Sequence, residues 1–277
     1  MPELPEVELV VRSLNALVKG KTITEALLLR AKLAPDTSAK ETAQLVSNSE
    51  INFVRRRGKH ILFDLSKGIT LIVHLRMSGR FLILPVEIEN PKFSHAVFYL
   101  QDETKLIFQD QRHFGFMRVV RTAELPDARE LKKLAPEPFS EEFSVKYLKD
   151  VLTSSSKSLK EFLLDQTKIC GLGNIYAAEA MFLARLNPKL RANNVSAVKA
   201  KRLHTFIIEV LNESIEFCST LEVDPENIEG NYYGGSYENG WRVYDREDLP
   251  CVNCSTKIKR IKQAGRSSYY CPKCQRQ

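Results

Sequence analysis

Apolar positions recur with two different periods along this 277-residue chain. At the start, the apolar residues fall at 7, 10, 11, 14, 17 and 18, which is the spacing of one helix face. Pro5 and Glu6 stand at the beginning of this run, where proline is tolerated and a carboxylate favours the positive end of a helix. The pattern therefore predicts an amphipathic helix over 7–18.

From residue 23 to about 121 the chain changes to short β-branched and aromatic runs. The runs cover 60–66, 70–75, 80–84, 95–100, 105–109 and 115–121. Turn signals such as Lys67-Gly68 separate several of them. Regular short strands of this kind predict a β-sandwich or barrel.

A linker and then helices are predicted after the strands. Residues 122–140 hold three prolines and many charges, which indicates a domain boundary. Helical patterns follow near 144–152, 157–165, 174–185 and 195–217. Between the second and third of these, Gly171 and Gly173 permit a tight turn, and Asn174 is predicted to cap the next helix.

Composition excludes several classes of protein. The hydrophobic share of 43% and the charged share of 27% are ordinary for a folded chain, which argues against wholesale disorder. No run approaches the roughly 20 apolar residues that cross a bilayer, and the start, Met1-Pro2-Glu3, is unlike a signal peptide. We therefore expect no membrane contact and a cytoplasmic protein, associated with the nucleoid if it binds DNA.

The net charge of +7 lies entirely in the last 27 residues. The segment Cys251–Gln277 has seven Lys or Arg and no acid, so the charges of the first 250 residues cancel. A surplus confined to one short segment indicates a surface for a polyanion, most plausibly nucleic acid. The alternative is a solvated tail without function.

Four of the six cysteines form two pairs, Cys251-x2-Cys254 and Cys271-x2-Cys274, sixteen residues apart. This spacing predicts one tetrahedral Zn²⁺ site. Because four thiolates leave no open coordination position, the metal is structural. The basic residues between the pairs are expected to form a hairpin that faces phosphates, although zinc ribbons also mediate protein contacts.

These patterns together predict an α+β fold. An N-terminal helix and β-sandwich domain is expected over 1–130, a helical domain over 131–240 and a zinc-finger β-hairpin over 241–277.

The N-terminus offers unusual chemistry. A small second residue usually allows Met1 to be removed, and this would leave Pro2 with a secondary amine that attacks the sugar C1′ of a nucleotide. An α-amino group titrates near about 8, so part of it is neutral and nucleophilic at physiological pH. Glu3 would serve as a proton donor and Glu6 would hold the amine. The alternative is a capped helix start with two exposed carboxylates.

Two turn regions between strands offer further candidates. Lys59 follows three arginines at the mouth of a strand, where a lysine suits an acid–base step, or where the cations form an ordinary basic strand edge. Met77 and Phe114 stand in turns where they would act as wedges between bases, with Arg112 entering the space that a base leaves. The alternative for Met77 and Phe114 is core packing.

Together these residues resemble the formamidopyrimidine-DNA glycosylase family, which removes oxidised bases from DNA and has endonuclease VIII as its sister branch. Five ordered motifs bear the resemblance: 2–8, 112–115, 163–166, 171–176 and 265–274. Leu4 favours the formamidopyrimidine branch, because the sister branch usually has Gly there. The resemblance implies a helix–two-turns–helix domain before the zinc hairpin, a monomer, and damaged or abasic double-stranded DNA bound in a cleft between the domains.

The resemblance also implies roles for single residues. Pro2 matches the Schiff-base nucleophile, Glu3 the general acid that opens the sugar, and Lys59 the residue that assists β-elimination. The residues that match DNA contacts are Met77, Arg112 and Phe114, which fill the hole left by the flipped base, and His95, Lys160, Asn174 and Arg266, which bind phosphates. Arg266 is also assigned to the second elimination. The implied reaction is base excision followed by β,δ-elimination, which leaves a one-nucleotide gap.

Some segments depart from the family pattern. The run 243–248 replaces a usual Tyr-Gly-Arg-x-Gly, 217–220 replaces a Gly-Gly pair, 154–156 is less basic than usual, and 221–240 is unlike the usual loop over an oxidised purine. These differences bear on which base is accepted, and the preferred lesion, opposing base and turnover rate stay open. The altered 217–248 region also motivates a second hypothesis, a paralogue that binds damaged DNA with weak or no excision. A third hypothesis is a zinc-ribbon interaction protein without DNA chemistry.

Overall fold

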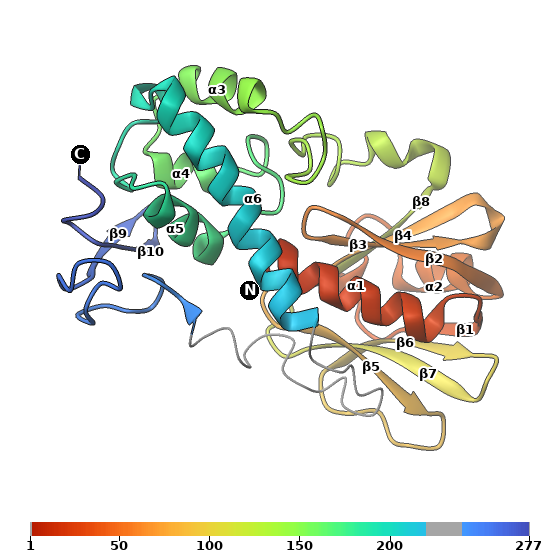
Figure 1. Cartoon of the computed structure of the whole chain (residues 1–277). Helices are drawn as coiled ribbons and strands as arrows, with labels where there is room; N and C mark the ends of the chain where they lie inside the picture. Colours follow the sequence, from red (N-terminus) through yellow and green to blue (C-terminus); the bar gives the residue numbers. More distant parts are fainter. Residues whose placement is uncertain (1, 220–239, 277) are drawn as a thin grey trace. The chain divides into compact units, whose positions relative to one another are not determined.

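The computed structural model describes residues 2–219 and 240–276, except the side chains of Cys218 and Ser219. These residues form two compact units, 2–132 and 133–218 with 240–276 (Figure 1). The atypical segment 221–239 lies outside the described residues. No helix among the described residues is long and apolar enough to cross a membrane.

The first unit is built on one eight-stranded antiparallel sheet with the order β5-β7-β6-β1-β2-β3-β4-β8. Its strands are β1 (Thr22–Leu28), β2 (Ser49–Arg57), β3 (His60–Leu65), β4 (Ile69–His74), β5 (Gly79–Pro85), β6 (Ser94–Leu100), β7 (Thr104–Asp110) and β8 (Phe116–Arg121). The rings of Phe63 on β3 and Phe81 on β5 lie 5.5 Å apart, although four strands stand between β5 and β3 in the sheet order. The sheet therefore folds over on itself into two layers around one core, as the predicted β-sandwich requires.

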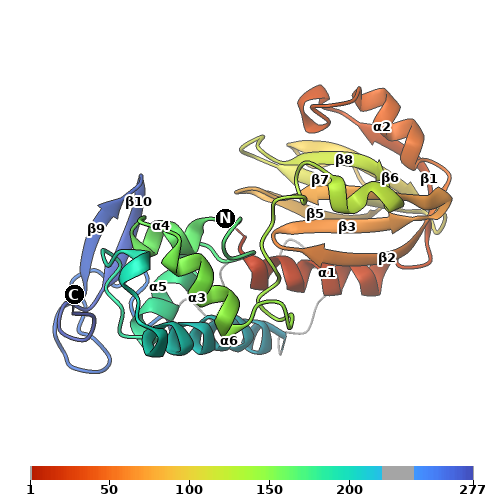
Figure 2. The same cartoon turned by 90° about the horizontal axis from the view of Figure 1, so that it is seen from above.

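Two helices lie on opposite sides of these strands, α1 (Leu4–Val18) and α2 (Ala39–Val46) (Figure 2). Helix α1 begins three residues earlier than its apolar spacing predicts, and Leu4 and Val7 are completely buried. Helix α2 was not predicted. It has only eight residues, is capped by the Ser38 hydroxyl and packs its inner side on β1.

All six predicted strand runs are present, within one residue at each end. Strands β1 and β2 were not singled out from the sequence. Strand β1 buries only two of its seven residues, and β2 ends in three arginines, so neither shows the apolar alternation of a half-buried strand. Three short 3₁₀ turns complete the unit, η1 (Ala31–Leu33), η2 (Ser66–Gly68) and η3 (Thr122–Asp127).

The second unit contains the predicted helices and the zinc segment. Its elements are α3 (Val145–Thr153), α4 (Leu159–Leu164), α5 (Asn174–Leu183), η4 (Ala192–Asn194), α6 (Ala197–Ser219), β9 (Lys259–Gln263) and β10 (Arg266–Tyr270). The prediction that Asn174 caps α5 is wrong: Gly173 is the cap residue and Asn174 is the first helical residue. Its side-chain amide donates instead to the carbonyl of Ser267, 3.1 Å away on β10.

The predicted hairpin of β9 and β10 packs on helix α5. The shared core contains Ala178 and Phe182 of α5 with Ile258 and Tyr269 of the zinc segment. The turn between the strands places Ala264 and Gly265 at positive φ, as a two-residue hairpin turn requires. The hairpin is therefore held in a fixed orientation on the helices of its own unit.

A buried carboxylate fixes the chain just before the zinc segment. Glu179 on α5 is completely buried and accepts hydrogen bonds of 2.9 Å from the backbone N–H groups of Arg242, Val243 and Tyr244. The Arg242 guanidinium lies 3.8 Å from the same carboxylate and also pairs with Glu213. One side chain of α5 thus satisfies three consecutive donors that would otherwise be buried without a partner.

We predict that Glu179→Ala destabilises the second unit by about 3–5 kcal/mol, because it leaves three backbone N–H groups without their acceptor and removes one of the two carboxylates beside Arg242. Urea denaturation monitored by the intrinsic fluorescence of Trp241 measures the loss. The matched control is Glu209→Ala, an exposed glutamate on α6, which should change stability by no more than about 0.5 kcal/mol. Equal effects of the two substitutions would contradict the role given to Glu179.

Candidate functional site

The chain start is held by a reciprocal capping arrangement. The Glu6 carboxylate accepts a hydrogen bond of 2.7 Å from the backbone N–H of Glu3, and the Glu3 carboxylate accepts one from the backbone N–H of Glu6. Pro2 is buried and Glu3 is only 2% exposed. The capped helix start of the alternative is therefore real, but its two carboxylates are not exposed: Glu3 is buried and Glu6 is half-buried. A buried carboxylate suits proton transfer better than one in bulk water.

Lys59 lies in the turn between β2 and β3, and it is buried with 7% exposure. Gly58 precedes it at positive φ, which allows the tight reversal of the chain. The alternative of an ordinary solvated basic edge does not fit this burial. An amine held away from water is a better candidate for acid–base work than one on a flexible surface chain.

Two histidines pack beside this turn. The rings of His60 and His74 meet edge-on at 4.7 Å, and both approach Phe116. Burial, and then the neighbouring His60, Arg76 and Lys59, lower the pKa of His74 to about 2. Neutral His74 accepts a hydrogen bond of 2.9 Å from the backbone N–H of Arg76, one residue before Met77. The histidine therefore shapes the loop between β4 and β5.

The predicted wedge residues are exposed. Met77 is 43% exposed in the β4–β5 loop, and Phe114 is 55% exposed in the β7–β8 loop. The Arg112 guanidinium lies 5.4 Å from the centre of the Phe114 ring. Core packing, the alternative for Met77 and Phe114, is thus wrong.

His95, predicted as a phosphate contact, lies at the base of the same region. It is 7% exposed, and its Nε2 is 2.9 Å from the Asp110 carbonyl and 2.8 Å from Nδ1 of His113. Because a carbonyl only accepts, Nε2 bears the proton and His113 Nδ1 also accepts. Burial lowers the pKa of His95, and the neighbouring His113 and Arg30 lower it further. The hydrogen bond to the Asp110 carbonyl acts in the opposite direction but does not outweigh them.

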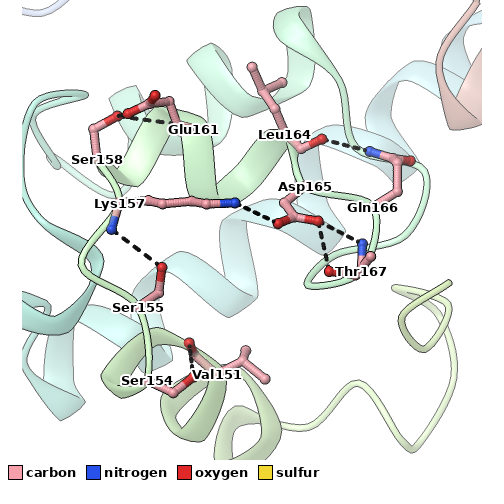
Figure 3. Close-up of polar contacts among 10 residues, drawn as sticks. All are labelled: Val151, Ser154, Ser155, Lys157, Ser158, Glu161, Leu164, Asp165, Gln166 and Thr167. Atoms are coloured by element: carbon pink, nitrogen blue, oxygen red, sulfur yellow. Dashed lines mark hydrogen bonds and ion pairs between the residues drawn. The ribbon is translucent and has the colours of Figure 1, made fainter. Parts of the chain in front are cut away.

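In the second unit, side chains tie the turns around α4 together. Figure 3 shows the Asp165 carboxylate accepting from Lys157 and from the N–H and hydroxyl of Thr167. The Gln166 amide donates to the carbonyls of Leu164 and Leu172, and its oxygen accepts from the N–H of Gly171. One glutamine therefore closes the tight turn that leads into α5.

Three predicted phosphate contacts lie along one connected path in this unit. The ammonium of Lys160, a residue only 1% exposed on α4, donates to the Asn174 carbonyl at 2.8 Å. The Asn174 amide donates to the Ser267 carbonyl, and Ser267 follows the exposed Arg266. The structure thus brings Lys160, Asn174 and the Arg266 strand together. Whether these groups and the chain start meet on one DNA duplex remains a prediction.

All seven cations of the zinc segment are exposed. Arg260, however, donates to the Ser267 hydroxyl at 2.9 Å, pairs with Glu247 at 3.3 Å and lies over the Tyr269 ring. The Arg260 guanidinium is therefore already engaged in contacts within the protein. The six other cations, Lys257, Lys259, Lys262, Arg266, Lys273 and Arg276, make no such ion pair in the part of the chain that is described.

The four predicted cysteines converge as a metal site. Their Sγ atoms all lie within 4.8 Å of one another, and the pairs Cys251–Cys274 and Cys254–Cys271 are separated by 3.9 and 3.5 Å. Tetrahedral Zn–S bonds of about 2.3 Å place sulfur atoms about 3.8 Å apart. The donor set therefore fits one structural Zn²⁺. Partial burial and the neighbouring thiols raise the pKa of Cys274, and the charge of a metal ion would offset this cost of the thiolate.

The atypical run 243–248 keeps a special backbone. Asp245 and Asp248, which stand where glycines were expected from the resemblance, have φ values of 55° and 62°. Aspartate tolerates this left-handed region better than most residues. The Asp245 carboxylate also accepts from the Tyr269 hydroxyl at 3.0 Å. This departure therefore leaves the loop conformation suited to glycine intact.

Several residues that organise these regions were missed by sequence reasoning. Asp110 and Ser78 connect the two wedge loops, Gln166 closes a turn, and Glu179 fixes the approach to the zinc segment. Asp110 stands two residues before the motif 112–115, but its partner Ser78 is 32 residues away. No local pattern reveals such a pairing.

Three family models match successive parts of the chain. The formamidopyrimidine-DNA glycosylase N-terminal domain matches residues 1–117, the formamidopyrimidine-DNA glycosylase H2TH domain matches 134–223, and a zinc finger found in FPG and IleRS matches 248–277. Together these matches cover most of the chain, in the order of the predicted elements.

Similar proteins match over the full length. A formamidopyrimidine-DNA glycosylase of Desulforamulus reducens is 40% identical over 277 residues, which is 100% of this chain and 99% of that protein. A protein of the same name from Listeria monocytogenes, also a formamidopyrimidine-DNA glycosylase, is 37% identical over 276 residues, with 100% of both chains covered.

Solved structures of Lactococcus lactis Fpg are also similar. One complex, with abasic-site DNA, has a TM-score of 0.90 and 30% identity over 99% of this chain and 100% of that one. Another, with DNA containing N7-benzyl-Fapy-dG, has a TM-score of 0.90 and 31% identity over 100% of both chains.

We predict that the chain binds one zinc ion and that Cys271→Ser abolishes this binding. Removing the metal with a chelator should expose the β9–β10 amides to hydrogen exchange, because the segment is too short to fold on its own core. Metal analysis and exchange mass spectrometry measure both effects. Cys170→Ser, which changes a buried cysteine outside the cluster, should keep the zinc. A protected hairpin in metal-free protein would contradict the prediction.

His74 should make stability depend on pH. Its pKa lies near 2 in the folded chain and near 6.5 unfolded, so between these values only the unfolded chain gains a proton. The contribution of neutral His74 is therefore full above pH 6.5 and falls with increasing acidity. His74→Gln should reduce the slope of unfolding free energy between about pH 6 and pH 4 by up to about 1.4 kcal/mol per pH unit. Urea denaturation across this range measures the slope, and an unchanged slope would refute the prediction.

Proposed function

This chain belongs to the formamidopyrimidine-DNA glycosylase family, and we propose that it excises oxidised bases from duplex DNA with the imino nitrogen of Pro2 as nucleophile. Base-excision repair by a DNA glycosylase is the function shared by the relatives and solved structures that match it. The observation that best supports the proposed chemistry is the buried cap at the start of α1. It holds Glu3 and Glu6 directly beside the residue that becomes the chain terminus after Met1 is removed.

The proposed reaction proceeds through base loss, sugar opening, two eliminations and hydrolysis. The Pro2 nitrogen forms a bond to C1′ of the damaged nucleotide as the glycosidic bond breaks, and the base leaves with the bonding electron pair and takes up the proton that the nitrogen loses. Glu3 donates a proton to the ring oxygen O4′, so the sugar opens to an iminium. Loss of a C2′ proton then expels the 3′ phosphate, with Lys59 assisting. Loss of the C4′ proton in a second elimination, with Arg266 nearby, expels the 5′ phosphate. Water finally releases the amine.

The DNA contacts in this proposal come from both units. Met77, Arg112 and Phe114 fill the space of the extruded base, which suits their exposure on two neighbouring loops. His95, Lys160, Asn174 and Arg266 bind phosphates, and the exposed cations of the zinc segment add attraction that does not depend on sequence. The protein acts as a monomer on nucleoid DNA in the cytoplasm.

Oxidised purines with an opened imidazole ring are the proposed main substrates. The similar Lactococcus lactis enzyme has been solved with a Fapy-dG derivative and also with an oxidised pyrimidine. The binding-only alternative rested on the altered 217–248 region. It loses support because Asp245 and Asp248 keep left-handed backbone conformations and the proposed catalytic groups are elsewhere.

We predict that borohydride traps a covalent adduct between Met1-processed protein and an abasic duplex, and that Pro2→Gly reduces excision and trapping by at least about tenfold. Gel separation of adduct and cleaved ends measures both. The control Pro5→Ala changes the other proline at the helix start and should retain the adduct. Tight binding without strand scission would instead favour the binding-only paralogue, and unchanged activity of Pro2→Gly would remove Pro2 from the mechanism.

A further inference from the structure

The two loops that bear the wedge residues leave the sheet side by side. The β4–β5 loop contains Met77, and the β7–β8 loop contains Arg112 and Phe114. Strands β5 and β7 are paired, with Gly79 directly opposite Asp110. Asp110 is therefore the last strand residue before the β7–β8 loop, and it lies opposite the residue at which the β4–β5 loop ends.

The Asp110 carboxylate binds both loops at once. Its Oδ1 accepts from the Ser78 hydroxyl at 2.5 Å and from the Arg112 N–H at 3.1 Å, while Oδ2 accepts from the Gly115 N–H at 2.7 Å. The Ser78 oxygen in turn accepts from the Arg112 N–H at 3.0 Å. Arg112 is thus itself part of this hydrogen-bonded group, and Met77 and Phe114 are each one residue from a member of it.

This group is enclosed by protein. Asp110 is only 1% exposed. Burial opposes its ionisation, but hydrogen bonds from Ser78 and from the N–H groups of Gly115, Arg112 and Phe114 outweigh burial and hold its pKa below the ordinary value. The carboxylate therefore remains an acceptor for both loops at physiological pH.

The same strand also limits movement of the loops through close packing. A Cβ atom at Gly79 would lie 2.9 Å from the Phe108 ring and 2.5 Å from the Leu75 carbonyl oxygen, and one at Gly115 would lie 2.6 Å from that ring. Phe108 and Asp110 are two residues apart on β7 and so face the same side. Both loops are consequently packed against one ring and bonded to one carboxylate.

We propose that Asp110 is a positioning residue that joins the two loops into one rigid unit, so that Met77, Arg112 and Phe114 enter DNA together. The inference rests on the proposed function, in which these side chains fill the space of an extruded base. Because the loops are ordered before DNA binds, their ordering entropy does not oppose insertion. Loops that moved independently would insert one side chain without the others.

The test compares Asp110→Asn with Asp102→Asn. In Asp110→Asn the amide oxygen replaces only one of the two carboxylate oxygens. The NH₂ group then faces either the Gly115 N–H or the Ser78 and Arg112 donors, so the three donors cannot all keep their acceptor. Asp102 is the matched control: it stands in the β6–β7 turn, binds Thr104 and Lys21, and does not touch either loop. Each protein is assayed for scission of one abasic oligonucleotide, first annealed to its complement and then as a single strand. Single strands need no wedge, since there is no stacked partner strand to hold apart.

We expect Asp110→Asn to lower duplex kcat/KM by about 10- to 100-fold while single-strand scission stays within about twofold of wild type, and Asp102→Asn to leave both within about twofold. A general loss of folded protein would instead lower the scission of both substrates equally. Ser78→Ala provides a second variant if Asp110→Asn fails to fold, because it removes only the hydroxyl that links the loops.

A double-substitution cycle tests the coupling directly. In the wild-type background, Met77→Ala and Phe114→Ala should be strongly non-additive on the duplex, since losing either wedge disables the concerted insertion. In the Ser78→Ala background the two substitutions should act independently, so that their fold-reductions in duplex kcat/KM multiply. The inference is overturned if wild type cuts the duplex but Asp110→Asn has the same duplex kcat/KM as Asp102→Asn. It is also overturned if the effects of Met77→Ala and Phe114→Ala are additive in the wild-type background. In both cases the proposed function stands. If wild type cuts neither substrate, the proposed function fails and this inference fails with it.

Discussion

The reciprocal hydrogen bonds between Glu3 and Glu6 constrain the first unit at its most important point. The first N–H groups of a helix lack intrahelical acceptors and must find them elsewhere when the helix start is buried. Two glutamates meet this need at the start of α1 and thereby come to lie beside Pro2. Since Leu4 and Val7 are part of the buried core, the position of the chain terminus is set by the packing of the whole sandwich.

Much of the fold follows from local patterns. Helix α1, six strands, the four predicted helices of the second unit and the zinc hairpin all have apolar spacings or cysteine pairs that are visible in short windows. The missed elements have no such signal: β1 and β2 bury few residues in alternation, and α2 is too short for a clear period. Their positions depend on pairing with β6 and on packing across the sandwich, which only the folded chain supplies.

The candidate site divides in the same way. Pro2, Lys59, the wedge residues and the cysteines were predicted because each stands in a compact motif. Asp110 with Ser78 and Glu179 with Arg242 were not, because their partners are 32 and 63 residues away. The capping role assigned to Asn174 was wrong for a related reason: its side chain binds Ser267, which is 93 residues away. The hydrogen-bond partners of buried polar groups are determined by the tertiary structure, so they cannot be predicted from the neighbouring residues in the sequence.

The left-handed aspartates at 245 and 248 show what a glycine position in this loop preserves. The requirement is a dihedral region, and a side chain with a nearby hydrogen-bond partner meets it almost as well as hydrogen does. Compared with glycine, an aspartate there has less conformational freedom to lose from the unfolded chain, while the folded loop keeps a left-handed backbone. A motif definition that insists on glycine at these two positions would therefore miss this chain, although its backbone adopts the conformation that glycine favours.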